Sequence, residues 1–84
     1  MEAIKVLYFS TVWCGPCRSI RPAIDGLIAA GWNIEKIDAD SDPRAREYSV
    51  AAVPTFIVFK DGVQVQRFSG ARRDIPQILQ RAAE

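Results

Sequence analysis

The chain has 84 residues, and we expect residues 1–84 to form one domain with room for a single modest core. Eleven Lys and Arg residues nearly balance ten Asp and Glu residues, and the basic side chains are scattered, which argues against nucleic acid or an anionic membrane as a partner. The sequence contains no histidine, which excludes histidine-based catalysis and nearly all mixed Cys/His zinc sites.

The first apolar run, residues 4–9, bears on where the chain works. It is interrupted by Lys5 and is too short for a signal peptide or a membrane span. The chain has two cysteines, Cys14 and Cys17, and none left over for a structural disulfide framework. We therefore expect a monomer of the reducing cytoplasm with no membrane attachment.

The first half of the chain predicts a strand, a helix and a second strand. Residues 4–9 are apolar at odd and even positions alike, which is typical of a central strand covered on both faces. A helix is expected over roughly residues 15–30, before Gly31, because apolar residues recur at helical spacing at Ile20, Ala23, Ile24, Leu27 and Ile28. Pro22 removes a hydrogen bond inside this helix, and we expect a kink there. Residues 33–38 predict the second strand.

The next segment predicts a short helix and a hairpin. Asp42-Pro43 indicates an N-cap followed by proline at the first helical position, opening a helix that ends at about Tyr48. Residues 55–59 and 63–68 are rich in β-prone side chains. Between them stands Asp61-Gly62, a hairpin signal.

A last helix completes the predicted fold. Asp74, with Gln77 three residues later, is expected to cap a helix whose apolar stripe is Ile75, Ile78, Leu79, Ala82 and Ala83. The element order is then β-α-β-α-β-β-α. The first βαβ unit must be parallel with a right-handed crossover, while the hairpin adds antiparallel strands. The sequence therefore predicts an α/β fold with a four-stranded mixed sheet flanked by three helices.

The strongest functional signal is the segment from Cys14 to Cys17. Two thiols separated by two residues can close a small disulfide ring and open it again. The pair lies just before the first predicted helix, where unpaired N–H groups and the helix dipole favour a thiolate. We favour a redox dithiol. The alternatives are an incidental pair or a zinc site, which would need carboxylates or cysteines of a second chain as further ligands.

The segment Trp13-Cys14-Gly15-Pro16-Cys17 resembles the active-site signature of the thioredoxin family. The resemblance covers nearly the whole chain, and the other matching positions are Pro22, Lys36, Asp40, residues 48–59 around Val53-Pro54-Thr55, Asp61-Gly62 and Gly70. Full-length members have an additional strand and helix at the N-terminus, whereas the first strand here begins almost at Met1. The resemblance implies a trimmed version of the thioredoxin fold.

The resemblance also implies roles within the motif, with a redox-active disulfide and no other cofactor. Cys14, before the helix and with an accessible sulfur, is expected to attack a target disulfide. Cys17, one turn inside the helix and more shielded, is expected to resolve the mixed disulfide. Gly15 permits the tight turn, and Pro16 suits a first helical turn because no N–H is needed there. We expect Trp13 to be an exposed platform beside the nucleophile.

A substrate groove is implied as well. The backbone of Val53 is expected to face Cys14 and to pair with an extended peptide, with Pro54 in the cis form. Gly70 and Ala71 would complete a shallow apolar groove. Because Pro54 offers no N–H and leaves no room for a metal ligand, we expect no metal.

Tyr8 departs from the family pattern. The family commonly has a buried aspartate at this position, six residues before the nucleophile, as proton acceptor for the second cysteine. A tyrosine with its ordinary pKa near 10 is a poor base at neutral pH. Deprotonation of Cys17 would then use water, the leaving thiolate or the cation of Lys36. Lys36 is equally well placed to pair with Asp38 or Asp40.

Three functions remain in view. The leading one is a protein-disulfide reductase that passes electrons to disulfide-containing targets and is recharged by thioredoxin reductase or a similar donor. The alternative is a glutaredoxin-like carrier, for example to ribonucleotide reductase, although its usual Pro-Tyr pair between the cysteines is absent. The third is a non-catalytic binding module.

Overall fold

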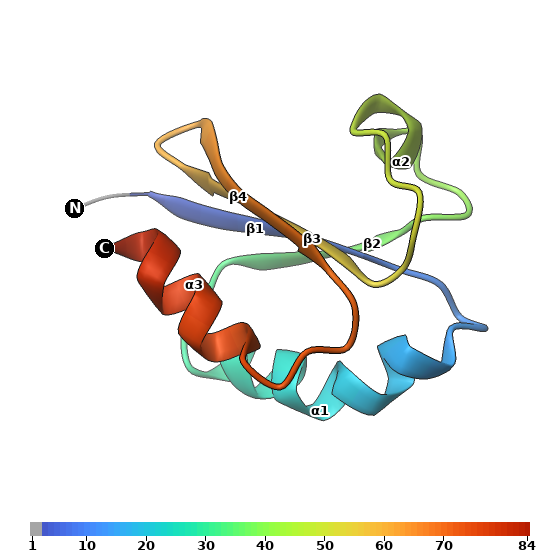
Figure 1. The fold of residues 1–84 in the computed structure, drawn as a ribbon, viewed down its shortest axis with the longest axis horizontal. Coiled ribbons are helices and arrows are strands. Elements are labelled where there is room, and N and C mark those ends of the chain that lie inside the picture. Colours follow the sequence, from blue (N-terminus) through green and yellow to red (C-terminus); the bar gives the residue numbers. More distant parts are fainter. Residues whose placement is uncertain (1–2) are drawn as a thin grey trace.

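The computed structural model describes residues 3–84. In chain order its elements are β1 (Ile4–Ser10), α1 (Gly15–Ala29), β2 (Ile34–Asp38), α2 (Arg44–Glu47), β3 (Thr55–Lys60), β4 (Val63–Ser69) and α3 (Ile75–Ala83) (Figure 1). This is the predicted order β-α-β-α-β-β-α. Across residues 3–84, we find no helix with the length and apolar character needed to span a bilayer.

The strands form one mixed sheet in the order β2-β1-β3-β4. β1 is parallel to β2, with Tyr8 opposite Lys36, and antiparallel to β3, with Tyr8 opposite Phe56. β4 pairs antiparallel with β3 at the sheet edge. The parallel pair is joined through α1, because such a pair needs a crossover connection. The predicted four-stranded mixed sheet with three helices is confirmed.

The helices cover the two faces of the sheet unequally, as Figure 1 shows: α1 and α3 lie on one face and the short α2 on the other. Beneath α1 and α3 the buried cluster is Val6, Tyr8, Ile20, Ile24, Ile34, Phe56, Val58, Phe68, Ile75 and Leu79. On the α2 face it is Leu7, Phe9, Ile37, Ala45 and Ile57. Because successive strand residues point to opposite faces, β1 contributes to both clusters. This explains why both the odd-numbered and the even-numbered positions of β1 carry apolar residues.

The helix α1 begins directly at the cysteine motif. Its buried residues are Cys17, Ile20 and Ile24, the inner part of the predicted stripe. Gly31 follows the helix with a φ of 105°, in the left-handed region that favours glycine. Pro22 lies inside the helix, which continues on both sides of it. The kink at Pro22 stays a prediction.

The cap of α2 differs from the expected one by a residue. Pro43, with φ −62° and ψ −18°, occupies the N-cap position, and the helix ends at Glu47 with Tyr48 as its C-cap, in agreement with the expected end at about Tyr48. The Asp42 carboxylate nevertheless accepts a hydrogen bond from the Arg44 backbone N–H at 2.9 Å. Asp42 therefore satisfies a free helical N–H group, as a capping side chain does.

The predicted cap of α3 is only half right. Asp74 stands at the N-cap position, but its side chain makes no capping hydrogen bond. Both of its carboxylate oxygens accept hydrogen bonds from the Arg72 guanidinium, each at 2.9 Å. A bidentate, charge-assisted ion pair of this kind competes with the backbone N–H donors of the helix for the carboxylate oxygens.

The hairpin between β3 and β4 turns at Asp61 and Gly62, as predicted. Both residues have positive φ, 52° and 82° respectively. Positive φ at both central residues is the requirement of a type I′ turn, which matches the twist of the paired strands.

Candidate active site

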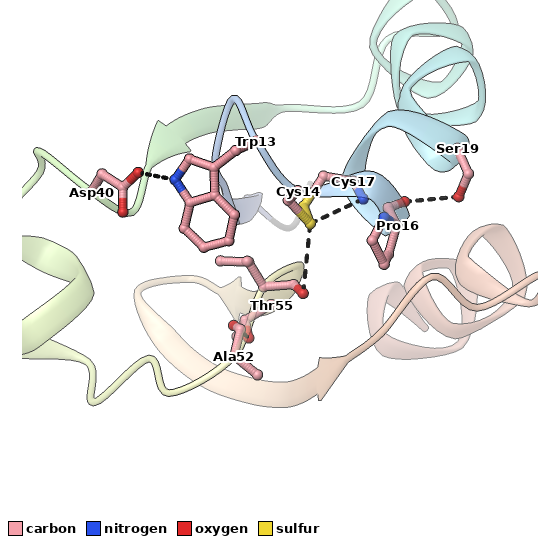
Figure 2. Close-up of a disulfide and its surroundings, with 9 residues drawn as sticks. Trp13, Cys14, Pro16, Cys17, Ser19, Asp40, Ala52 and Thr55 are labelled. Carbon is pink, nitrogen blue, oxygen red and sulfur yellow. Dashed lines mark hydrogen bonds between the residues drawn. A yellow bond between two sulfur atoms is a disulfide. The ribbon is translucent and has the colours of Figure 1, made fainter.

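The cysteine pair lies where β1 ends and α1 begins. Cys14 is the N-cap of α1, with an extended backbone at φ −81° and ψ 112°. It forms a disulfide with Cys17, and the two Cα atoms are 5.2 Å apart (Figure 2). This Cα separation lies inside the ordinary range for disulfides, so the helix start itself brings the two sulfurs within bonding reach.

The helix terminus provides the electrostatic environment of Cys14. The Cys17 backbone N–H donates a hydrogen bond to Cys14 Sγ at 3.2 Å. Pro16 stands in the first turn, where a missing N–H costs no hydrogen bond. Both the N–H donor and the positive end of the α1 dipole favour negative charge on the Cys14 sulfur. The local structure therefore suits a thiolate after the disulfide opens.

Both cysteines are buried in this disulfide form. Cys14 retains 4% of its accessible surface and Cys17 2%. As whole residues the two cysteines therefore differ little in burial, and greater access to the Cys14 sulfur stays a prediction. The loop before β3 covers Cys14, because the carbonyl oxygen of Val53 lies 3.8 Å from Cys14 Sγ.

Two hydrogen bonds stabilise the loop that covers Cys14. The Val53-Pro54 peptide bond is cis, as the family resemblance implies. Thr55 Oγ1 donates a hydrogen bond to the Ala52 carbonyl at 2.5 Å, and Gly70 N–H donates to the Pro54 carbonyl at 2.9 Å. The structure thus brings Val53, Pro54 and Gly70 together beside the disulfide.

Three further residues of the motif and the groove lie on the surface, namely Gly15, Pro16 and Ala71, whereas Gly70 is half-buried. Gly70 has a φ of 96°, a conformation that residues with a side chain rarely adopt. Gly70 therefore lets the chain turn away from Pro54 toward α3.

Trp13 is an exposed residue, as predicted, with 65% of its surface accessible. Figure 2 shows the indole ring turned away from Cys14 toward Asp40, and its Nε1 donates a hydrogen bond to Asp40 Oδ2 at 2.7 Å. This partnership was not predicted, because Asp40 was considered only beside Lys36. Val12, exposed at 81%, was also missed. The sequence signal that could have revealed Val12 is an apolar residue in the loop next to the cysteines.

Tyr8 is a core residue beneath α1. It is 4% exposed, and its ring stacks on Phe56 with centroids 4.9 Å apart. Burial raises the pKa of the Tyr8 hydroxyl above its ordinary value of 10, and a hydrogen bond with Ser10 offsets part of that rise. Tyr8 therefore stays neutral at physiological pH and does not serve as a base.

Lys36 forms an ion pair, but not the predicted one. Its Nζ contacts the carboxylate of Asp25 on α1, rather than Asp38 or Asp40. Lys36 stands opposite Tyr8 in the sheet and therefore on the face that α1 covers, where Asp25 is available. Asp38 Oδ1 instead accepts the Asp40 backbone N–H at 2.9 Å. An effect of Lys36 on Cys17 stays a prediction.

Thr11 is a further residue that sequence reasoning missed. Its carbonyl accepts the Cys14 N–H at 3.4 Å, and its side chain is buried. The Thr11 hydroxyl has no hydrogen-bond partner among residues 3–84. A threonine three residues before the first cysteine was the available signal.

A dithiol at a helix N-terminus, facing a cis-proline loop on a four-stranded mixed sheet, defines a thiol-disulfide exchange protein. The thioredoxin family model matches residues 1–82. Thioredoxin of Chlamydia trachomatis is 45% identical over 74 residues, which cover 84% of this chain and 72% of that protein. Thioredoxin H2 of Arabidopsis thaliana is 42% identical over 74 residues, 84% of this chain and 56% of that protein. The chain belongs to the thioredoxin family.

Solved structures agree with this assignment. Fasciola hepatica thioredoxin superposes with a TM-score of 0.87 at 38% identity, covering 94% of this chain and 80% of that one. Nicotiana alata thioredoxin superposes with a TM-score of 0.88 at 34% identity, covering 96% and 74%. The family consists of protein-disulfide oxidoreductases, and these relatives favour that activity over the glutaredoxin alternative.

Proposed function

We propose that this chain reduces protein disulfides through a reversible Cys14-Cys17 dithiol and passes the electrons to its targets. The observation that carries the proposal is the disulfide at the start of α1, with the Cys17 N–H directed at Cys14 Sγ at 3.2 Å. That hydrogen bond stabilises charge on one sulfur of the pair, and exchange needs one activated sulfur.

The proposed reaction has two exchange steps. The Cys14 thiolate attacks one sulfur of the target disulfide, forming a mixed disulfide, and the other target sulfur leaves as a thiolate that takes up a proton. Cys17 then loses its proton and attacks Cys14 Sγ, which closes the ring and releases the second target thiol. Two electrons pass to the target, and the chain ends as the disulfide observed here.

Burial limits which group can receive the Cys17 proton. The raised pKa of Tyr8 makes that hydroxyl a poor acceptor, and Lys36 is a cation paired with Asp25. We propose that the proton leaves to water or to the departing thiolate of the target, with Lys36 acting at most through its charge. The pH dependence of turnover then follows the two thiols.

The target is proposed to lie across the motif and the loops beside it. Trp13, Gly15, Pro16 and Ala71 supply exposed surface. Val53, Pro54 and Gly70 form the inner wall, joined by the hydrogen bond from Gly70 to Pro54. An extended target segment would pair with the Val53 backbone, which places its sulfur above Cys14. Because Cys14 is covered in the disulfide form, small movements of this loop would accompany exchange.

The proposed partners are a thioredoxin reductase or similar electron donor and disulfide-containing proteins. Membership of the thioredoxin family supports both. We further propose that residues 1–84 act as one domain, as a monomer in the cytoplasm, in electron transport and redox homeostasis. The redox-active disulfide would be the only cofactor.

Insulin reduction tests the proposal. The wild-type chain should turn over with either a thioredoxin reductase system or dithiothreitol as donor, whereas Cys14→Ser should be inactive. Cys17→Ser should trap target proteins as mixed disulfides. A chain that turns over only with glutathione and glutathione reductase would point to the glutaredoxin alternative. No turnover with any donor would contradict reductase activity.

A further inference from the structure

A pocket of about 240 Å³ lies next to the cysteine pair, and the exchange chemistry described above does not use it. It opens between the end of β1, the second turn of α1 and the end of β2. The lining residues that matter here are Ser10, Thr11, Val12, Arg21, Lys36 and Asp38.

The pocket is close enough to the disulfide to contact a bound target. Val12 is two residues before Cys14, a span of at most about 7.6 Å between Cα atoms. Arg21 is one helical turn beyond Cys17. An extended segment advances about 3.3 Å per residue, so a target residue two to four positions from its reacting cysteine would reach the pocket.

Among the charged residues that line this pocket, Arg21 is the one available to bind a charged group of a target. Lys36 is paired with Asp25, and one oxygen of Asp38 accepts the Asp40 backbone N–H. The Arg21 side chain is exposed and makes no ion pair or hydrogen bond with any of residues 3–84. Its planar guanidinium carries several N–H donors that match the two oxygens of a carboxylate.

Two further observations indicate a binding site. Thr11 lines the pocket, and its buried hydroxyl has no hydrogen-bond partner among the described residues. Beside it, Val12 exposes 81% of its surface, so an apolar contact is available at the rim. A guanidinium beside an apolar rim suits an acidic side chain on an extended chain.

We propose that this pocket binds a carboxylate of the target, held by Arg21, and thereby favours substrates with Asp or Glu two to four residues from the reacting cystine. The inference rests on the proposed reductase function and adds a substrate preference to it. Because the contact is partly exposed, its contribution is modest and is weakened by salt.

The test compares two synthetic peptide disulfides that differ only in Glu or Gln three residues from the cystine, both with amidated C-termini. The wild-type chain should reduce the Glu peptide with a kcat/KM about two- to fivefold higher, and added NaCl should remove the difference.

Matched variants assign the effect to the pocket. Arg21→Gln should abolish the preference for Glu while leaving reduction of the Gln peptide unchanged, and Arg21→Glu should favour a Lys peptide instead. Arg81→Gln, an exposed arginine near the end of α3, should behave as the wild type.

Equal rates on the Glu and Gln peptides with the wild type, or equal losses on both with Arg21→Gln, would overturn the carboxylate site. Either result leaves the reductase function standing, because reduction of the Gln peptide measures that function independently. Failure to reduce every peptide and insulin would instead contradict the proposed function itself.

Discussion

The indole Nε1 of Trp13 donates a hydrogen bond to Asp40 Oδ2 at 2.7 Å and so joins the loop before α1 to the loop after β2. These residues are 27 positions apart in the chain. The bond holds a largely exposed ring in one orientation beside the cysteine pair. A ring fixed in advance loses less conformational entropy when a target binds.

Asp40→Ala should therefore free the indole ring and weaken target binding. We expect faster decay of tryptophan fluorescence anisotropy, measured in a Trp32→Phe background. We also expect the KM for insulin to rise about threefold. A hydrogen bond to a charged group contributes about 1.5–3 kcal/mol, and the exposure of this pair reduces that contribution. Asp40→Asn keeps an acceptor oxygen and should show a smaller change. Unchanged anisotropy in Asp40→Ala would contradict the orienting role.

Gly70→Ala should destabilise the fold through the backbone alone. A Cβ on Gly70 would meet no atom within 4 Å, but the φ of 96° is unfavourable for alanine, at a cost of about 1–2 kcal/mol. Urea unfolding should report this loss as a lower midpoint with an unchanged slope.

Gly26→Ala is the matched comparison for Gly70→Ala. Gly26 lies inside α1, and its added Cβ would also meet no atom within 4 Å. Alanine is the better helix former, so the free energy of unfolding should rise by about 0.5–1 kcal/mol. A decrease in both variants would show that loss of glycine itself, rather than φ, governs the result.

Glu35 should make the stability of the fold sensitive to acid. Hydrogen bonds from the Arg44 guanidinium and from Lys5 lower the pKa of the Glu35 carboxyl from 4.5 to about 2. The contribution is fully present above pH 4.5, where the unfolded chain is also ionised, and it is lost as the pH falls from about 4.5 to about 2. Because the pair is partly exposed, the effect should be small and salt-dependent.

Urea unfolding at several pH values between 5 and 2 measures this contribution. Glu35→Gln should flatten the pH dependence in that window relative to the wild type. Glu47→Gln, an exposed glutamate on α2, should leave the profile unchanged. Parallel profiles for the wild type and Glu35→Gln would count against the Arg44 and Lys5 pairs.

Tyr8→Phe should leave the pH profile of disulfide reduction unchanged near neutrality. Burial raises the pKa of the Tyr8 hydroxyl, so it does not titrate there. A displaced pH profile in Tyr8→Phe, measured by insulin reduction, would instead assign Tyr8 a part in proton transfer.

The sequence predicted the elements whose signals are local or periodic. The helical stripe through Ile20 and Ile24 and the apolar residues of β1 after Lys5 each specify an element together with its buried face. The motif residues were likewise found, because the two cysteines and their position before a helix are visible in the chain.

What could not be predicted depends on which side chains meet after folding. Lys36 had acidic neighbours two and four residues away, but α1 presents Asp25 to it. Asp74 had the sequence of a cap, but Arg72 takes both of its oxygens. Cys14 is covered by Val53, which is 39 residues distant. Each of these outcomes is decided by tertiary packing.

The double role of β1 has a consequence for redox cycling. Its side chains belong to both buried clusters, so its amide protons should exchange with solvent only when the whole molecule unfolds. The short α2 covers its face alone, and its amides should exchange through local opening. Cys14 comes four residues after the end of β1. The disulfide should therefore form and break beside the strand whose amide protons exchange most slowly.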